Sequence, residues 1–279
     1  MENATRTVKL RGSGLDFEVL TGDTIIGPAI ERGAWEEHET RLFLAHLRPG
    51  ARVVDLGANV GWFTVHAMLA GCEVHAFEPV PWIADVLERN ARTAERAGFG
   101  RAIVHRAAAG SVRGTARIAL ANSNFGDNRL LDVRAERPAD MGTGREIEIA
   151  VERVDDHVRG PVSVLKIDTQ GSEWHALQGA RELLEASPRI ALLLEFWPYA
   201  LRGATPEELI AHLAERGFTI GKATAAPYPM SAARIVRQAR DRDPVKGGLD
   251  LYGTRGLPFH VGSTLDYARA QWRSWREAR

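Results

Sequence analysis

The segment that decides the fold lies between residues 52 and 69, and its centre reads Val53-Val54-Asp55-Leu56-Gly57-Ala58-Asn59-Val60-Gly61-Trp62. Arg52–Leu56 is a short β-branched run that ends at a glycine, which predicts a buried strand, and Gly61–Leu69 is expected to form a helix. Gly57 and Gly61 let the backbone turn sharply and lie against a ligand without a Cβ clash. We expect free N–H groups and a positive dipole at the helix start, which suit an anion. A ligand site is therefore predicted at this turn, where open α/β sheets bind nucleotides.

Strands and helices alternate on the C-terminal side of this segment. The expected strands are Arg52–Leu56, Glu73–Phe77, Ile103–Ala107, Val162–Ile167, Arg189–Phe196, Phe218–Lys222 and Leu249–Thr254. The expected helices are Gly61–Leu69, Pro81–Ala97, Glu173–Glu185 and Pro206–Arg216. This alternation predicts an α/β fold with a doubly wound, mostly parallel sheet.

Other segments flank or interrupt this core, which is expected to span residues 51–256 as one domain. Residues 1–50 predict an N-terminal extension of two strands and one helix packed on the core. Residues 115–154 carry two strand patterns around a polar stretch and predict an inserted β hairpin or flap; residues 226–248 contain prolines and arginines and predict a lid or loop. Residues 257–279 predict a C-terminal helix whose Trp272 and Trp275 pack against the body or against a second subunit in a homodimer.

Acidic residues follow the first two core strands. Asp55, just before the glycine loop, would repel a pyrophosphate but suit the ammonium group of a methionine moiety. Glu78 follows the second strand, where an acid hydrogen-bonds ribose hydroxyls. The Gly57–Gly61 spacing also lacks the third glycine of dinucleotide enzymes. These features favour S-adenosylmethionine over a nicotinamide cofactor; the alternatives are a tight turn without a ligand and a surface glutamate that caps a turn.

A third polar cluster follows the fourth strand and reads Lys166-Ile167-Asp168-Thr169-Gln170-Gly171-Ser172-Glu173. Because this strand is expected to lie beside the first, Asp168 should face the reacting centre and orient or deprotonate a nucleophile. Glu173 is expected to cap its helix rather than to react, and Lys166 to form a salt bridge. His175 is a further candidate base.

Two other polar features have open interpretations. Glu195 interrupts an apolar strand, so it either pairs with a cation such as Lys166 or reaches the substrate pocket. Asn124 lies in a stretch rich in Asn and Asp, which is either a solvated loop or a flap that closes on the cofactor or substrate.

Composition excludes several classes of protein. The 36 basic and 36 acidic residues give a net charge of zero, which does not favour nucleic acid. Cys72 is the single cysteine, so an intrachain disulfide and a multi-cysteine metal site are excluded, and the histidines show no metal-ligand spacing. The start of the chain lacks a secretory signal, and apolar runs are far shorter than the ~20 residues that span a bilayer. A cytoplasmic protein without a membrane partner is expected.

These motifs together resemble the FkbM-type methyltransferases, a branch of the class I S-adenosylmethionine enzymes with a Rossmann-like sheet. The resemblance covers roughly residues 30–200 and rests on Asp55–Gly61, Phe77-Glu78-Pro79, Lys166–Glu173 with Leu177 and Gly179, and more weakly Gly33-Ala34-Trp35-Glu36. It implies a seven-stranded sheet with an antiparallel last strand and methyl transfer from S-adenosylmethionine, with S-adenosylhomocysteine as product. The acceptors it implies are mostly hydroxyls of sugars or secondary metabolites. The family often has an acid where Gln170 stands, which leaves the acceptor open.

Carried over onto this chain, the resemblance assigns Asp55, Gly57 and Asn59 to the methionine end, Glu78 to the ribose, and Ala107 or Ala108 to the adenine edge. The full set of expected cofactor-binding residues is Trp35, Glu36, Asp55, Gly57, Ala58, Asn59, Gly61, Phe77, Glu78, Pro79, Ala107, Ala108, Asn124 and Asp168.

The expected reaction is a direct displacement by a small-molecule hydroxyl, with Asp168 as the first candidate base or orienting group and Glu195 as the second. No metal is required, although Asp168 with Glu173 could hold Mg²⁺. The alternatives are N- or C-methylation, a nicotinamide-dependent oxidoreductase, and a catalytically silent scaffold.

Overall fold

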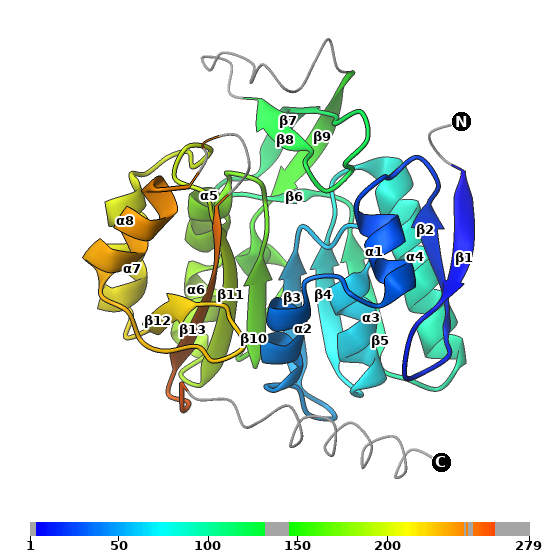
Figure 1. Cartoon of the computed structure of the whole chain (residues 1–279), viewed down its shortest axis with the longest axis horizontal. Coiled ribbons are helices and arrows are strands. Elements are labelled where there is room, and N and C mark those ends of the chain that lie inside the picture. Colours follow the sequence, from blue (N-terminus) through cyan, green and yellow to red (C-terminus); the bar gives the residue numbers. More distant parts are fainter. Residues whose placement is uncertain (1–3, 132–144, 243, 245–247, 260–279) are drawn as a thin grey trace.

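A seven-stranded sheet forms the centre of the computed structural model, which describes residues 4–131, 145–242, 244 and 248–259 (Figure 1). Its strand order is β12-β13-β11-β10-β3-β4-β5. The strands are β3 (Arg52–Leu56), β4 (Glu73–Phe77), β5 (Arg101–His105), β10 (Val164–Ile167), β11 (Ile190–Phe196), β12 (Thr219–Lys222) and β13 (Leu249–Arg255). Only β13 runs antiparallel to its neighbours, so the predicted doubly wound sheet with an antiparallel last strand is confirmed.

Helices cover both faces of the sheet because its central strands are apolar on both sides. On β3, Val53 packs with α2, α3 and α4, whereas Val54 packs with α5, α6, α7 and α8 on the other face. The helices are α1 (Ile26–Arg32), α2 (Glu37–Leu44), α3 (Trp62–Leu69), α4 (Pro81–Arg96), α5 (Glu173–Gly179), α6 (Arg181–Ala186), α7 (Pro206–Glu215) and α8 (Ala232–Arg240). None of the helices in these described ranges is long and apolar enough to cross a membrane.

A second, four-stranded sheet lies above the carboxyl ends of β3 and β4 (Figure 1). Its order is β6-β9-β7-β8, with β6 (Ala108–Ala109), β7 (Gly114–Ala119), β8 (Arg129–Leu131) and β9 (Glu146–Glu152). The predicted inserted hairpin corresponds to the antiparallel pair β7–β9, which β6 and β8 extend on either side. The short helix η2 (Val154–Asp156) then leads back towards the main sheet.

The N-terminal region is a hairpin followed by two helices. β1 (Thr5–Lys9) and β2 (Asp16–Leu20) pair with each other and lie beside α4 (Figure 1). α1 is an element that the sequence did not predict.

Several predicted elements differ from the structure, and the third and fourth core strands begin at Arg101 and Val164 instead of Ile103 and Val162. The expected helix Glu173–Glu185 is two helices, since Gly179 packs against the backbone of Gly110: an added Cβ would lie 2.0 Å from the Gly110 carbonyl oxygen. The expected loop at residues 226–248 contains α8, which packs beside α7 through the buried Ile235 and Val236. The predicted C-terminal helix with Trp272 and Trp275 lies outside the described residues.

The glycine turn after β3 depends on a close contact with the neighbouring strand. Gly57 has φ 76°, and a Cβ there would lie 1.8 Å from the carbonyl oxygen of Asp168. Gly50 has nearly the same φ, 77°, but open space around it.

We therefore expect Gly57→Ala to lower the free energy of unfolding by several kcal/mol, and Gly50→Ala by only the ~1–2 kcal/mol of a left-handed non-glycine residue. Urea denaturation of the two variants separates the contact from the backbone strain. Equal losses would show that the approach of Asp168 does not require a glycine.

Candidate active site

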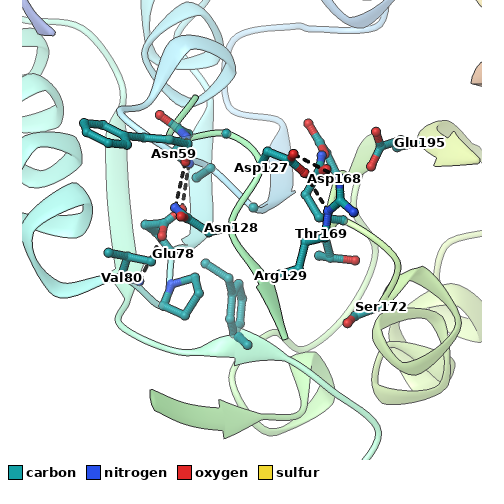
Figure 2. A pocket seen from close by; sticks show the side chains of 18 of the residues that line it. Asn59, Glu78, Val80, Asp127, Asn128, Arg129, Asp168, Thr169, Ser172 and Glu195 are labelled. Atoms are coloured by element: carbon teal, nitrogen blue, oxygen red, sulfur yellow. Dashed lines mark hydrogen bonds and ion pairs between the residues drawn. The ribbon is translucent and has the colours of Figure 1, made fainter. Parts of the chain in front are cut away.

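A cavity of about 500 Å³ lies at the carboxyl ends of the central strands, with the inserted sheet above it (Figure 2). Its volume is in the range of cofactor and small-molecule sites. The predicted site residues that line it are Trp35, Glu36, Gly57, Ala58, Asn59, Phe77, Glu78, Pro79, Ala108, Asn124, Asp168 and Glu195.

Glu78 anchors the turn after β3. Its Oε2 accepts the backbone N–H of Asn59 at 3.0 Å, and its Oε1 accepts that of Val80 at 2.9 Å (Figure 2). The side chain is 5% exposed, and this burial raises the pKa of Glu78 to about 7. Because each carboxylate oxygen has a second lone pair, Glu78 can still accept hydrogen bonds from ribose hydroxyls in the cavity.

The backbone N–H groups of the glycine turn itself are held within the protein. Those of Gly57 and Ala58 donate to the carbonyl oxygen of Phe77, and that of Gly61 donates to Ala58. The Asn59 N–H donates to Glu78, and the Val60 N–H donates to the side chain of Asn59 at 2.7 Å. The free N–H groups predicted for the helix start concern the next residues, from Trp62 onward, and these bonds do not test that prediction.

Asp55 lies beneath the turn rather than in the cavity wall. It is fully buried; its Oδ2 accepts the hydroxyl of Thr64 at 2.7 Å, and its Oδ1 lies 3.8 Å from the ammonium group of Lys166. Burial raises the pKa of Asp55, and Lys166 opposes that effect. Because Asp55 is not among the residues that line the cavity, the expected direct contact between Asp55 and the donor's ammonium group is not available in this arrangement.

Asp168, which follows β10, the strand next to β3, lines the cavity. Lys166 lies 3.4 Å from its Oδ2, and the side-chain amide of Gln170 donates to its Oδ1 at 2.8 Å. Lys166 is buried, which alone would lower its pKa, but Asp168, Asp55 and Glu36 raise it above the ordinary value. The ammonium group is therefore charged and holds the carboxylates of two adjacent strand ends.

Three other carboxyl groups line the cavity near Asp168: Glu36, Glu195 and Asp250. None of them forms an ion pair within 4 Å with a cation in the described part of the chain. Burial raises the pKa of Glu36 and of Glu195 well above the ordinary value, and raises that of Asp250 to about 7. The predicted pairing of Glu195 with Lys166 is not formed; the other interpretation, that it reaches the pocket, holds.

The asparagine-rich stretch forms part of the cavity wall. The Phe125 N–H donates to Asp23 Oδ2 at 2.8 Å, and its carbonyl oxygen accepts the side-chain amides of Asn59 and Asn128. Asp23 Oδ1 also accepts N–H groups at the start of α1, including that of Ile26. This single buried aspartate therefore joins α1 to the flap, here defined as residues 122–130.

Sequence reasoning missed the residues that close the other side of the cavity. Arg129 is 5% exposed, pairs with Asp127 at 2.7 Å, and lies 4.3 Å above the ring of Trp197 (Figure 2). This contact joins β8 of the inserted sheet to the end of β11. The contact between Arg129 and Trp197 could not be predicted from local sequence, because the two residues lie 68 positions apart. The only local signal was the pair of opposite charges, Asp127 and Arg129, within the flap.

Several predicted residues lie apart from the cavity wall. Gly61 has a φ of 96°, and a side chain at this position would collide with Leu87. Ala107 is buried and, unlike its neighbour Ala108, does not line the cavity. His175 on α5 is next to Gly203 and 3.4 Å from the Ser111 hydroxyl, outside the residues that line the cavity.

Glu173 holds the turn before its own helix instead of capping the helix, because the start of α5 has no side-chain cap hydrogen bond. Its Oε1 accepts the N–H groups of Thr169 and Gly171. Within the described ranges, no group of three or more His, Cys, Asp or Glu side chains is arranged to hold a metal ion.

Comparison with known proteins gives the family. The sequence profile of the methyltransferase FkbM domain matches residues 55–220. The chain is 30% identical over 232 residues to the 31-O-demethyl-FK506 methyltransferase FkbM of Streptomyces tacrolimicus, a match that covers 72% of this chain and 85% of that protein. The chain belongs to the FkbM methyltransferase family.

Two solved structures are also similar. A methyltransferase FkbM from Methylobacillus flagellatus KT has a TM-score of 0.45 and 20% identity, covering 73% of this chain and 43% of that one, so the present chain spans less than half of that protein. The magnesium protoporphyrin IX methyltransferase of Synechocystis PCC 6803, solved with bound S-adenosylmethionine, has a TM-score of 0.44 and 13% identity, covering 84% of this chain and 85% of that one.

As a member of the FkbM family, the chain is an S-adenosylmethionine-dependent methyltransferase, as its sequence predicted. The two other classes, a nicotinamide-dependent oxidoreductase and a silent scaffold, are set aside by this membership. The family profile begins at Asp55 and includes Glu78 and Asp168.

The contribution of the buried Lys166 to stability can be tested by a substitution that removes its charge. In Lys166→Met, Asp55 and Asp168 lose their shared cation, and breaking such a pair lowers the free energy of unfolding by about 3–5 kcal/mol. The control is Lys9→Met, which removes a surface ion pair with Asp16 and should change stability by less than about 1 kcal/mol. Urea denaturation that gave similar small losses for both variants would contradict a central role for Lys166.

Proposed function

We propose that this FkbM-family methyltransferase transfers the methyl group to a hydroxyl oxygen of a small molecule. The observation that supports this most is that one cavity combines a turn and carboxylate suited to the donor with two carboxylates, Asp168 and Glu195, suited to a hydroxyl. The relative from Streptomyces tacrolimicus is named for O-methylation of a small molecule, which also favours an oxygen acceptor.

The residues at one end of the cavity fit the donor. Glu78 would accept the ribose hydroxyls, Asn59 and Gly57 would lie along the methionine part, and the apolar Ala108 and Phe77 would contact the adenine. With Asp55 buried beneath the turn, Glu36 becomes the carboxylate in the wall that would attract the donor's ammonium group. When bound, S-adenosylmethionine supplies an electrophilic methyl group on a sulfonium.

Asp168 and Glu195 have different roles in this proposal. Asp168 already accepts from Gln170 and is paired with Lys166, so it is a fixed acceptor that orients the hydroxyl. Glu195 has no cation beside it, and its raised pKa makes it the better proton acceptor. We therefore assign the base to Glu195, reversing the order expected from the sequence, and the orienting group to Asp168.

Glu78→Ala should weaken binding of S-adenosylhomocysteine by roughly 10- to 100-fold, since a charged acceptor is worth about 1.5–3 kcal/mol. Isothermal titration calorimetry measures the change directly. Glu95→Ala, an exposed glutamate on α4, serves as the matched control. Near-unchanged affinity in Glu78→Ala would remove the donor assignment of this end of the cavity.

Glu195→Gln should lower kcat by roughly 10²–10⁴-fold, the usual contribution of a positioned base, and leave S-adenosylhomocysteine binding intact. Transfer of a radiolabelled methyl group is measured on 31-O-demethyl-FK506 and on hydroxylated glycosides, with Glu215→Gln, exposed at the end of α7, as control. The base must be ionised, so the wild-type rate should rise with pH through the raised pKa of Glu195. Full activity in Glu195→Gln, or methyl groups found on nitrogen or carbon, would contradict the proposal.

A further inference from the structure

Glu195 and Asp250 are directly opposite residues in the antiparallel pair β11–β13. Opposite residues in such a pair point to the same face of the sheet, with Cβ atoms about 4.5–5.5 Å apart, and like charges there are destabilising. Both side chains line the cavity. Folding alone does not favour this pair, which suggests a role in the site.

The charged groups that act most strongly on Glu195 are all acidic. They are Asp168 after β10, Glu173 on α5, Asp250 on β13 and Glu36 before α2. Its Oε2 is inaccessible to solvent and has no hydrogen-bond partner among the described residues. Glu195 therefore differs from Asp168, whose charge is balanced by Lys166.

Asp250 lines the same cavity and is exposed to solvent there. Desolvation by the surrounding protein raises the pKa of Asp250, Glu39 on α2 and Asp168 add to this effect, and Lys166 and Arg242 oppose it. Two neighbouring carboxyl groups with raised pKa values release their protons in separate steps that belong to the pair. After the first of these steps the pair carries one negative charge.

We propose that Glu195 and Asp250, opposite each other on β11 and β13, act as one carboxyl pair that releases its two protons in separate steps. In this pair Asp250 is a positioning residue that makes Glu195 a stronger proton acceptor. The inference rests on the proposed function, in which Glu195 takes the proton of the acceptor hydroxyl. As the oxygen gains the methyl group it loses its proton to the pair, whose charge falls from minus one to zero, and the donor leaves as S-adenosylhomocysteine.

The pair can be tested without knowing the acceptor. Protein labelled with ¹³C at the glutamate side-chain carboxyl carbons is titrated by NMR, free and with S-adenosylhomocysteine, and the Glu195 signal is the one lost in Glu195→Gln. Its midpoint should lie above the ordinary value of about 4.3. In Asp250→Asn the midpoint should fall by about one pH unit or more, because the like charge is gone.

Asp241→Asn, which changes the exposed aspartate after α8, is the matched control and should leave the midpoint unchanged. An unchanged midpoint in Asp250→Asn, or an ordinary midpoint in the wild type, overturns the pair. With an accepted hydroxyl compound, Asp250→Asn should also move the rising limb of kcat/KM to lower pH. One outcome separates the two proposals. If Asp250→Asn shifts the midpoint of Glu195 but Glu195→Gln transfers methyl groups normally, the carboxyl pair is supported and the assignment of Glu195 as the base is wrong.

Discussion

The buried ammonium group of Lys166 is the interaction on which the site depends. It lies between Asp55 on β3 and Asp168 after β10, and it also packs 4.8 Å from the ring of Phe63. Without a cation at this position, the buried carboxylate of Asp55 and the partly exposed carboxylate of Asp168 would lie at adjacent strand ends with no compensating charge. The central charge therefore allows the sheet to present acidic groups at its edge and still fold.

The two ends of the cavity are built by different means. The end proposed for the donor consists mainly of backbone held by Glu78 and by the approach of Gly57 to Asp168, so its shape follows from the sheet itself. The end proposed for the acceptor consists of side chains from separate elements, including Glu195, Trp197 and Asp250. Because these side chains do not share a local framework, they can change without disturbing the donor end.

Local patterns predicted the core well, and long-range packing accounts for what they missed. β3 and β4 were predicted with their observed ends because apolar runs stop at Gly57 and Glu78. α1 contains Gly27 and Pro28 and begins with help from Asp23, so no helical pattern indicated it. Asp250 lies at the site because β13 pairs with β11, and the burial of Asp55 depends on Lys166. Neither contact can be predicted from the spacing of residues in the sequence.

The walls of the cavity extend beyond the part of the chain that defines the family. The profile match runs from 55 to 220, whereas Trp35 and Glu36 precede it and Asp250 follows it. An alignment restricted to the shared region therefore leaves out Glu36, which is proposed to attract the donor, and Asp250, which is proposed to act on the acceptor side. Sorting such enzymes by the compounds they modify requires comparison of the last strand as well, where a substitution can alter the acceptor side without altering the turn after β3.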